Sequence, residues 1–263
     1  MRRFAVISVR FGSARRWFAI LVLSLLTALS LAIAPAQARN LFATEQTQNL
    51  FVANQSTNTI REFSQTGVDL GYFATTGLNG PTGLAFDKLG NLYVSNINDN
   101  TIREFSRTGV DLGDFATTGL SSPRGIAFDK HGNLYVANVS WIREFSPTGV
   151  DLGNFATTGF IAPALIAFDK RGNLYVTNFG GNTIREFSRT GVDLGDFATT
   201  GLSFPAGVAF DKHGNLYVSN RGDGTIRKFS PSGADLGYFA TTGMTTPVGL
   251  AFSPEPDDQN GDG

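Results

Sequence analysis

Hydrophobic residues between positions 49 and 254 fall into short runs that recur in a fixed order. One unit of 42 residues begins at Asn91 and contains four such runs, at 92–95, 102–105, 112–116 and 125–128. The runs are rich in β-branched and aromatic residues and are bounded by Gly, Asn, Asp or Pro, which is typical of short strands separated by turns. Each unit is therefore predicted to form four antiparallel strands.

Repetition of this unit decides the predicted fold. Five copies begin at Asn49, Asn91, Asn133, Asn173 and Asn215, and the third copy is two residues shorter than the others. A repeat of about 40 residues with four strands is typical of a propeller blade. The strands are apolar on both faces, as expected where neighbouring blades cover them. We predict an all-β propeller of five four-stranded blades, in which the run with the small residues Gly125 and Ala127 is innermost.

The connections carry recognisable turn chemistry. Residues Asp129 to Asn133 predict a type I turn closed by a Gly in the left-handed region. Residues Ser146 to Gly149 place Pro at the second position of a turn, where its fixed φ is suitable. Both turn designs recur in the other copies, so these connections are expected to be structural.

The ends of the repeat region predict how the ring closes. The first copy starts with the second strand of a blade, at Leu50, and the chain ends with the first strand of a blade, Gly249 to Phe252. Pairing of these two segments in one blade leaves no open sheet edge. The predicted organisation is a propeller over 49–254, with a short lead-in at 39–48 and a polar acidic tail at 255–263.

A family resemblance follows from two motifs. Pro123-Arg124-Gly125-Ile126-Ala127-Phe128-Asp129 and Gly132-Asn133-Leu134-Tyr135-Val136-Ala137-Asn138 resemble the NHL repeat, and they recur with the same spacing along the repeat region. The resemblance implies a β-propeller, commonly with six blades, whereas five copies are countable here. The family usually has Asp where this chain has Asn54, Asn96, Asn138, Asn178 and Asn220.

The first 38 residues differ from the rest and predict an export signal. Five arginines precede an apolar run from Trp17 to Ala34, and Ala36-Gln37-Ala38 provides a small-x-small cleavage site. Residues 15–18 resemble a twin-arginine signal, while the Leu-rich run suits the general secretory route equally. The competing hypothesis is a retained membrane anchor, since about 20 apolar residues span a bilayer. We predict cleavage after Ala38, a periplasmic, extracellular or cell-surface location, and no membrane association after cleavage.

Charge and composition narrow the function classes. The 263 residues include 21 basic and 22 acidic ones. Because five of the basic residues lie in the first 38, which contain no acid, the remaining chain carries 16 basic against 22 acidic residues. This disfavours nucleic-acid binding, which requires Lys and Arg to neutralise phosphates. The absence of Cys excludes disulfides, thiol catalysis and Cys-ligated zinc.

Differences between the copies concentrate in two sets of connections. One set joins the second and third strands of each blade, at 55–58, 97–100, 139–141, 179–182 and 221–224, and the other joins consecutive blades, at 78–80, 120–122, 160–162, 202–204 and 244–246. An antiparallel meander places both sets on the same side of the disc. We call this side the variable-loop face and expect a ligand there.

Six residues are candidates for binding on the variable-loop face: Trp141, Phe160, Phe179, Phe204, Arg124 and Arg221. Exposed aromatic side chains provide contact area at little cost in conformational entropy. The competing interpretation is that these loops vary without selection and that the rings pack against neighbouring loops. Blade three also differs from the others, because its loop is short and Leu165 replaces the small Gly of the other inner strands.

Metal and catalytic sites have weaker support in the sequence. The five Asn residues at the ends of the second strands, Asn54, Asn96, Asn138, Asn178 and Asn220, could hold a hard cation such as Ca²⁺ if their oxygens point to the axis. No cofactor is otherwise predicted. The two histidines, His131 and His213, occupy the same exposed turn in two copies. The repeated Asp69, Asp111, Asp151, Asp193 and Asp235 are expected to accept hydrogen bonds in turns, not to act as general acids.

Two short motifs are interpreted as structural. Arg221-Gly222-Asp223 is the tripeptide that integrins bind, but its loop position suggests ordinary turn chemistry. Residues 258–263 match the first half of a calcium loop and are expected to be a solvated tail.

Two hypotheses for function remain. The leading one is an exported, non-catalytic scaffold that binds a protein or a carbohydrate through the variable-loop face. The alternative, implied by the family resemblance, is a metal-dependent lactone hydrolase or lyase with its site in the axial channel. Such an enzyme needs different side chains to converge from different blades, and nearly identical inner strands supply few of them. Arg124 is the main exception.

Overall fold

The computed structural model describes residues 49–64, 68–244 and 246–250, all within the compact unit Gln48–Gly263. The described part contains nineteen strands and no helix. In chain order the strands are β1 (Leu50–Asn54), β2 (Thr59–Phe63), β3 (Asp69–Ala74), β4 (Pro81–Phe86), β5 (Leu92–Asn96), β6 (Thr101–Phe105), β7 (Asp111–Ala116), β8 (Ile126–Phe128), β9 (Leu134–Ala137), β10 (Ile142–Phe145), β11 (Asp151–Ala156), β12 (Pro163–Phe168), β13 (Leu174–Asn178), β14 (Thr183–Phe187), β15 (Asp193–Ala198), β16 (Pro205–Phe210), β17 (Leu216–Asn220), β18 (Thr225–Phe229) and β19 (Asp235–Ala240).

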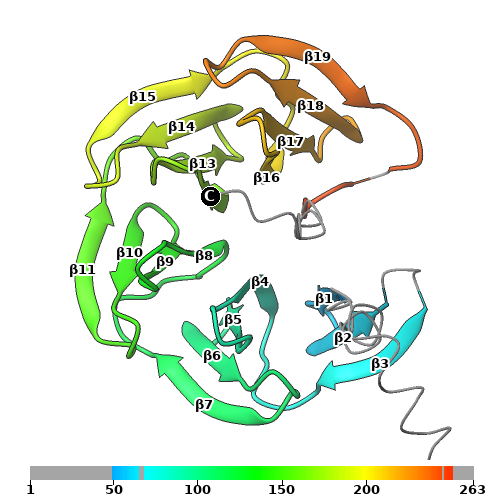
Figure 1. Ribbon diagram of the computed structural model, residues 1–263, viewed down its shortest axis with the longest axis vertical. Helices are drawn as coiled ribbons and strands as arrows, with labels where there is room; N and C mark the ends of the chain where they lie inside the picture. Colours follow the sequence, from blue (N-terminus) through cyan, green and yellow to red (C-terminus); the bar gives the residue numbers. More distant parts are fainter. Residues whose placement is uncertain (1–48, 65–67, 245, 251–263) are drawn as a thin grey trace, which may run out of the picture. The chain divides into compact units, whose positions relative to one another are not determined.

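The strands form five antiparallel sheets, and each sheet is one blade. Blade one contains the described strands β1–β3, and blades two to five contain β4–β7, β8–β11, β12–β15 and β16–β19. Strands β4, β8, β12 and β16 lie nearest the centre, while β7, β11, β15 and β19 lie at the rim (Figure 1). Strand β4 contacts β1 and β8, and β12 contacts β8 and β16. The predicted five-bladed all-β propeller and the predicted inner strand are confirmed.

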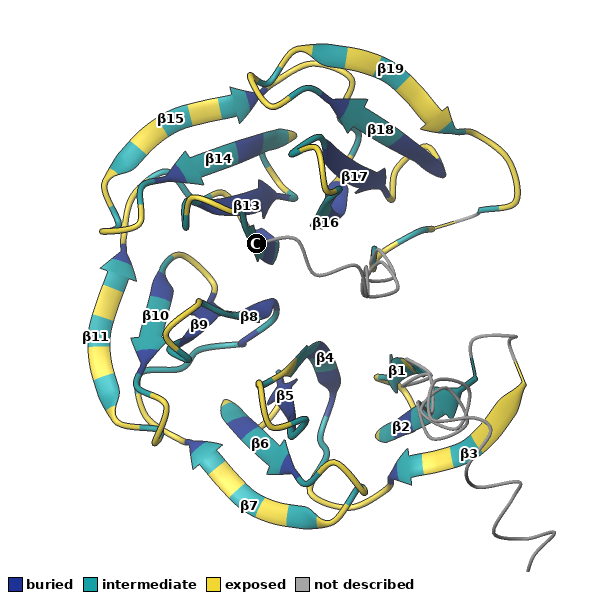
Figure 2. Cartoon of the chain, in the orientation of Figure 1, coloured by how far each residue is buried: buried dark blue, intermediate teal, exposed yellow. Residues whose placement is uncertain are grey.

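The hydrophobic core lies between consecutive blades. Strand β5 and its equivalents β9, β13 and β17 are buried along their whole length, whereas the rim strands alternate (Figure 2). Tyr93 of blade two packs edge-on against Phe115 of its own blade and Phe128 of blade three, with ring centroids 4.8 and 4.9 Å apart. Equivalent tyrosines repeat this arrangement in blades three and four. Burial on both faces is the reason for the two-sided apolar pattern in the sequence.

The turns on the opposite side from the variable-loop face have the predicted geometry. Gly132 adopts φ +90° and donates its N–H to the Asp129 carbonyl at 3.2 Å. The Asp129 side chain accepts the N–H groups of His131 and Asn133 at 2.8 and 2.9 Å. These contacts satisfy the backbone of the turn internally, which explains why the sequence motif hardly varies.

Buried hydroxyl groups join one blade to the next. Ser95 Oγ accepts the Gly83 N–H at 2.7 Å and donates to the Arg124 carbonyl of blade three at 2.5 Å. A Cβ added at Gly83 would lie 2.1 Å from that same carbonyl oxygen, so the inner strand needs a small residue here. Thr177 makes the same bridge from blade four to the Ala206 carbonyl of blade five at 2.8 Å.

Blades three and four meet without such a bridge. Ala137 takes the place of the hydroxyl residue, and the Gly125 N–H donates directly to the Ala164 carbonyl at 2.9 Å. The assignment of Leu165 to blade three is wrong, because the third sequence copy ends with the inner strand of the following blade. Leu165 lies in β12 of blade four and packs against the hydrophobic cluster shared by blades four and five.

The C-terminal segment reaches the position of the next inner strand. Ser219 of blade five donates to the Val248 carbonyl at 2.9 Å, as Ser95 does to Arg124. Residues 246–250 form no strand, and β1 pairs only with β2 among the described residues. Residues 251 and 252 of the predicted closing strand lie outside the described residues, so its pairing with β1 stays a prediction. The predicted segments 1–38, 39–48 and 255–263 also lie outside the described residues.

Replacement of Ser95 tests the inter-blade bridge. Ser95→Ala leaves the buried Gly83 N–H and Arg124 carbonyl without their hydroxyl partner, and we expect the free energy of unfolding to fall by about 1–3 kcal/mol. Urea unfolding followed by tryptophan fluorescence measures this loss. Ser95→Thr is the matched control, because Thr177 makes the same contacts in blade four. Equal stability of the alanine and threonine variants would contradict the bridge.

Candidate functional site

The variable-loop face is built from paired loops at each junction between blades. The backbone carbonyls of the connection between two blades accept hydrogen bonds from the backbone N–H groups of the hairpin loop of the second blade. Examples are the N–H of Ile97 to the Gly80 carbonyl at 3.1 Å and the N–H of Arg221 to the Phe204 carbonyl at 3.2 Å. The expectation that both loop sets lie on one side is confirmed.

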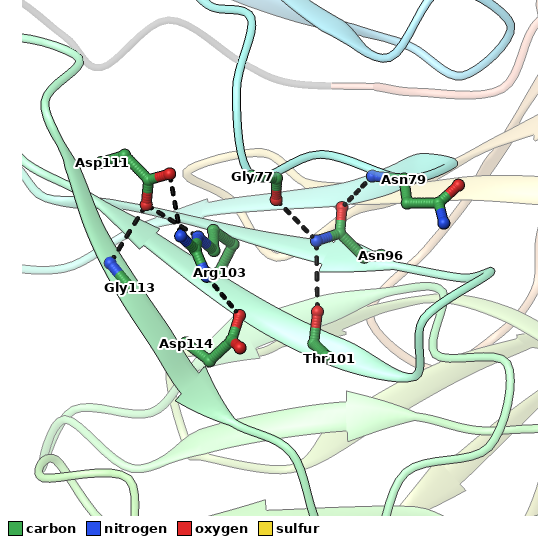
Figure 3. A network of polar contacts seen from close by, with 8 residues as sticks. All are labelled: Gly77, Asn79, Asn96, Thr101, Arg103, Asp111, Gly113 and Asp114. Atoms are coloured by element: carbon green, nitrogen blue, oxygen red, sulfur yellow. Dashed lines mark hydrogen bonds and ion pairs between the residues drawn. The ribbon is translucent and has the colours of Figure 1, made fainter.

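A buried asparagine holds each connection in place (Figure 3). Asn96 is 1% exposed, and its Oδ1 accepts the Asn79 N–H at 3.1 Å. Its Nδ2 donates to the Gly77 carbonyl at 3.0 Å and to Thr101 Oγ1 at 3.2 Å. Asn178 and Asn220 make the same three contacts in blades four and five. We call this arrangement the asparagine clamp.

Four of the five asparagines predicted as cation ligands use their side-chain oxygens within the fold. The side-chain oxygens of Asn96, Asn138, Asn178 and Asn220 all accept a backbone N–H from the preceding connection. Asn54 donates to Thr59 at 3.3 Å in blade one. The described part of the chain contains no group of three acidic or histidine side chains that could hold a metal ion. A calcium site stays a prediction from the sequence.

Trp141 takes over part of the clamp in blade three. The Trp141 carbonyl accepts the backbone N–H of Asn138, so Trp141 takes the hairpin position that Thr101 has opposite Asn96. Its indole N–H donates to the Gly119 carbonyl at 3.4 Å. In blades two, four and five the equivalent carbonyl accepts from the asparagine. Trp141 is half-buried and compensates for the shortened hairpin, so it contributes to the structure of this junction.

Phe160 is partly buried and packs against the hydrophobic core. Its ring stacks on that of the fully buried Phe187 with centroids 5.0 Å apart and planes at 26°. The equivalent residues Leu78, Leu120 and Leu202 also pack on core clusters. An apolar residue at this position in every copy is the signal that could have identified a core position. Its neighbour Ile161, not singled out from the sequence, is instead 57% exposed.

Three of the predicted binding residues come together at the junction of blades four and five. The rings of Phe179 and Phe204 have centroids 5.2 Å apart, and the guanidinium carbon of Arg221 lies 5.9 Å from the centroid of Phe179. Phe179 comes from the hairpin loop of blade four, Phe204 from the connection and Arg221 from the hairpin loop of blade five. We call these three residues the aromatic patch.

Phe204 occupies a backbone position that is unfavourable for a large side chain. Its φ is +46°, and the equivalent residue at the first junction is Gly80 with φ +66°. Asn182 Oδ1 accepts the Phe204 N–H at 2.6 Å and holds this conformation. The side chain is 48% exposed. The equivalent residues Ser122 and Ala162 are also left-handed, with φ of +46° and +50°, so the fold sets this conformation. Phe204 differs from them in the size of its side chain, which is unfavourable in the left-handed region.

The remaining candidates lie apart from the aromatic patch. The backbone of Arg124 belongs to the start of the inner segment of blade three, where its carbonyl accepts from Ser95. His131 and His213 lie in exposed turns of blades three and five. Asp223 accepts the N–H and hydroxyl of Thr225 at 3.2 and 2.7 Å, which is ordinary turn chemistry.

Each rim strand begins with an aspartate that forms an ion pair with the neighbouring strand. Arg103 donates to Asp111 through Nε at 2.7 Å and Nη2 at 2.9 Å (Figure 3). Asp111 also accepts the Gly113 N–H, as expected for a turn acceptor. The hydrogen bonds from Arg103 hold the pKa of Asp111 below its usual range, partly opposed by desolvation. Such a carboxyl group is ionised at neutral pH and does not act as a general acid.

The same pairing occurs in every blade, and sequence reasoning missed it. The other pairs are Arg61–Asp69, Arg143–Asp151, Arg185–Asp193 and Arg227–Asp235, and each arginine lowers the pKa of its aspartate. The signal was available, because Arg in Ile-Arg-x-Phe and Asp in Asp-Leu-Gly recur at a fixed spacing of eight residues.

Five antiparallel blades built from repeated units make this chain a β-propeller. Residues 202–229 match the NHL repeat. That match lies within one repeat unit, and together with the five-bladed fold it supports an NHL-repeat β-propeller. A search of curated protein sequences finds no match.

Solved structures show the same fold at low sequence identity. A chain in the crystal structure of a nidogen/laminin complex has a TM-score of 0.68 and 23% identity, over 77% of this chain and 81% of that chain. A streptogramin B lyase has a TM-score of 0.63 and 19% identity, over 76% and 68%. A gluconolactonase from Xanthomonas campestris has a TM-score of 0.65 and 19% identity, over 79% and 76%. These similarities concern the fold alone.

Acid titration tests the arginine–aspartate pairs. A carboxyl group whose pKa is lowered on folding contributes stability above its unfolded pKa of about 3.9 and loses it as the pH falls through the folded pKa. We therefore expect the unfolding free energy to be nearly constant from neutral pH to about pH 5 and to fall below about pH 4. Asp111→Asn removes the contribution of one of the five pairs. We therefore expect the unfolding free energy of this variant to fall less on acidification than that of the wild type. An equally steep loss in that variant would contradict the assignment.

Proposed function

We propose that this chain is a non-catalytic binding protein whose aromatic patch, Phe179, Phe204 and Arg221, contacts a protein partner. The observation that carries the proposal is the convergence of these side chains from three separate loops on one junction. The other junctions repeat the same backbone contacts with smaller or polar side chains, so the patch is not required by the fold.

The chemistry of the patch favours a protein over a carbohydrate. Aromatic and arginine side chains are enriched among the residues that dominate binding energy at protein interfaces. The patch has one charged donor and no side-chain acceptor, whereas sugar hydroxyls need both. Ile161, which is exposed beside the hairpin loop of blade four, extends the apolar surface.

Strain at Phe204 supports a binding role over drift of the loops. Phenylalanine in the left-handed region costs stability that Gly at the same position avoids. Retention of the bulky ring at a strained, half-exposed position is expected where the ring is used. The nidogen/laminin similarity adds support at the level of the fold, since that propeller occurs in a protein complex.

Export is part of the proposal. The basic segment, the apolar run and the Ala-Gln-Ala site within residues 1–38 support removal of a signal and function outside the cytoplasm. Within the described ranges, no helix is long and apolar enough to cross a membrane.

The enzyme hypothesis draws support from similarity of fold to a lyase and a gluconolactonase. Metal analysis separates it from the binding hypothesis. We expect the purified protein to contain less than stoichiometric calcium or zinc by elemental analysis, before and after treatment with chelator. A stoichiometric metal whose removal changes the melting temperature would overturn the non-catalytic proposal.

Phe204→Gly separates binding from stability. Gly relieves the backbone strain but adds entropy to the unfolded chain, so we expect the unfolding free energy to change by less than about 1 kcal/mol. Loss of the ring is expected to weaken binding of the partner at least about tenfold, because buried aromatic contacts at interfaces contribute 2 kcal/mol or more.

A secretome array probed with the wild type, Phe204→Gly and Arg221→Ala measures this loss. Trp141→Ala is the control, since Trp141 lies at the junction of blades two and three. Binding that survives both patch variants, or that only glycan spots show, would refute a protein-binding patch.

A further inference from the structure

A polar pocket of about 460 Å³ lies on the variable-loop face at the junction of blades one and two. Its lining includes Asn58 from the first hairpin loop, Asn79 from the connection, Asp99 and Thr101 from the second hairpin, and Asp114 from the rim strand β7. Figure 3 shows Asn79 and Thr101 bonded to the clamp residue Asn96, and Asp114 bonded to Arg103. The volume falls within the range of about 300–1,000 Å³ that is typical of small-molecule sites.

Side-chain contacts fix the walls of the pocket. Asn79 Nδ2 donates to Asp99 Oδ1, and Asn79 Oδ1 accepts from Asn98 Nδ2 at 3.0 Å. On the rim side, Arg103 Nη1 donates to Asp114 Oδ1 at 2.8 Å. The Asn79–Asp99 pair is specific to this junction, because the residues equivalent to Asn79 are Ser121, Ile161 and Ser203. The side chains are thus oriented by one another before any ligand binds.

These contacts leave two donor groups and two acceptor groups of the lining without a protein partner among the described residues. Asn58 Oδ1 accepts the Gly80 N–H at 2.7 Å, while its Nδ2 has no acceptor within the described residues. Thr101 Oγ1 accepts from Asn96, and its own hydroxyl proton has no acceptor there. Asp99 and Asp114 each use one carboxylate oxygen, and the other has no donor in the described part of the chain.

This balance selects the chemistry of the ligand. An anion would meet two carboxylates, and a cation would leave the Asn58 and Thr101 donors unpaired. A hydroxyl group donates and accepts at once, so neighbouring hydroxyls on one ring can satisfy both kinds of group. We propose that this pocket binds an uncharged sugar residue, either free or as part of a glycan.

The sugar site is independent of the aromatic patch. The two sites lie at different junctions and share no residue, so failure of one leaves the other intact. No aromatic ring is among the residues that line the pocket, so stacking does not add to the hydrogen bonds. We therefore expect dissociation constants in the millimolar range for single sugars.

Saturation-transfer difference NMR on the purified chain tests the proposal. The probes are glucose, galactose, mannose and N-acetylglucosamine, with lysine and acetate as charged competitors for the same assay. We expect a saturable signal from at least one sugar and none from the charged probes. A signal from lysine or acetate alone, or from no sugar, would overturn the proposal.

Two variants locate the site. Asp99→Ala is expected to weaken sugar binding about tenfold, because it removes a charged acceptor. Asp114→Asn keeps the shape of the side chain but removes its charge, and it is also expected to weaken sugar binding. Asp223→Ala, at the same hairpin position in blade five, is the matched control and should bind as the wild type does, as should Phe204→Gly. Equal affinity of Asp99→Ala and Asp223→Ala, at unchanged melting temperatures, would show that the sugar binds elsewhere.

Discussion

The structure depends on the asparagine that ends each second strand. In blades two to five its side-chain oxygen accepts one backbone N–H of the connection arriving from the preceding blade. In blades two, four and five its amide nitrogen also donates to one backbone carbonyl of that connection. Because buried polar groups without partners cost free energy, the connection has one favourable position at each junction. In blade three, Asn138 keeps the N–H contact and the Trp141 indole takes the carbonyl. The same backbone arrangement is thus held by two different side-chain solutions.

Side chains that do not take part in the clamp are therefore presented at fixed positions. The hairpin and connection residues next to it differ from junction to junction while their backbone contacts repeat. One junction gathers Phe179, Phe204 and Arg221, and another gathers Asn58, Asn79 and Asp99 around a pocket. Rigid presentation of variable residues lowers the ordering cost of binding. A ring of similar junctions can hold different ligands without changes in the scaffold.

The features predicted correctly from the sequence are those that follow from its periodicity. The features that were missed depend on how side chains pack in the folded chain. The repeat, the turn motifs and the two-sided apolar runs predicted the blades, the inner strands and the side on which the loops vary. Phe160 was chosen as a surface residue from its variation, although it stacks on Phe187 in the core and Ile161 beside it is exposed. The arginine–aspartate pairs were missed because each residue type was considered within its own strand. Their partners become neighbours only through the register of β6 with β7 and of its equivalents.

The sequence by itself determined the number of blades, the strand order within each blade and the residues that vary on one face, because these follow from local pattern and repetition. Only the tertiary structure decided which variable residues meet. Phe179 and Phe204 are 25 positions apart, and Asn58 and Asp99 are 41 apart, and nothing in their local sequence joins them. They come together because the asparagine clamp and the inter-blade hydroxyl bridges place each connection against the next hairpin, a contact that exists only after neighbouring blades have packed.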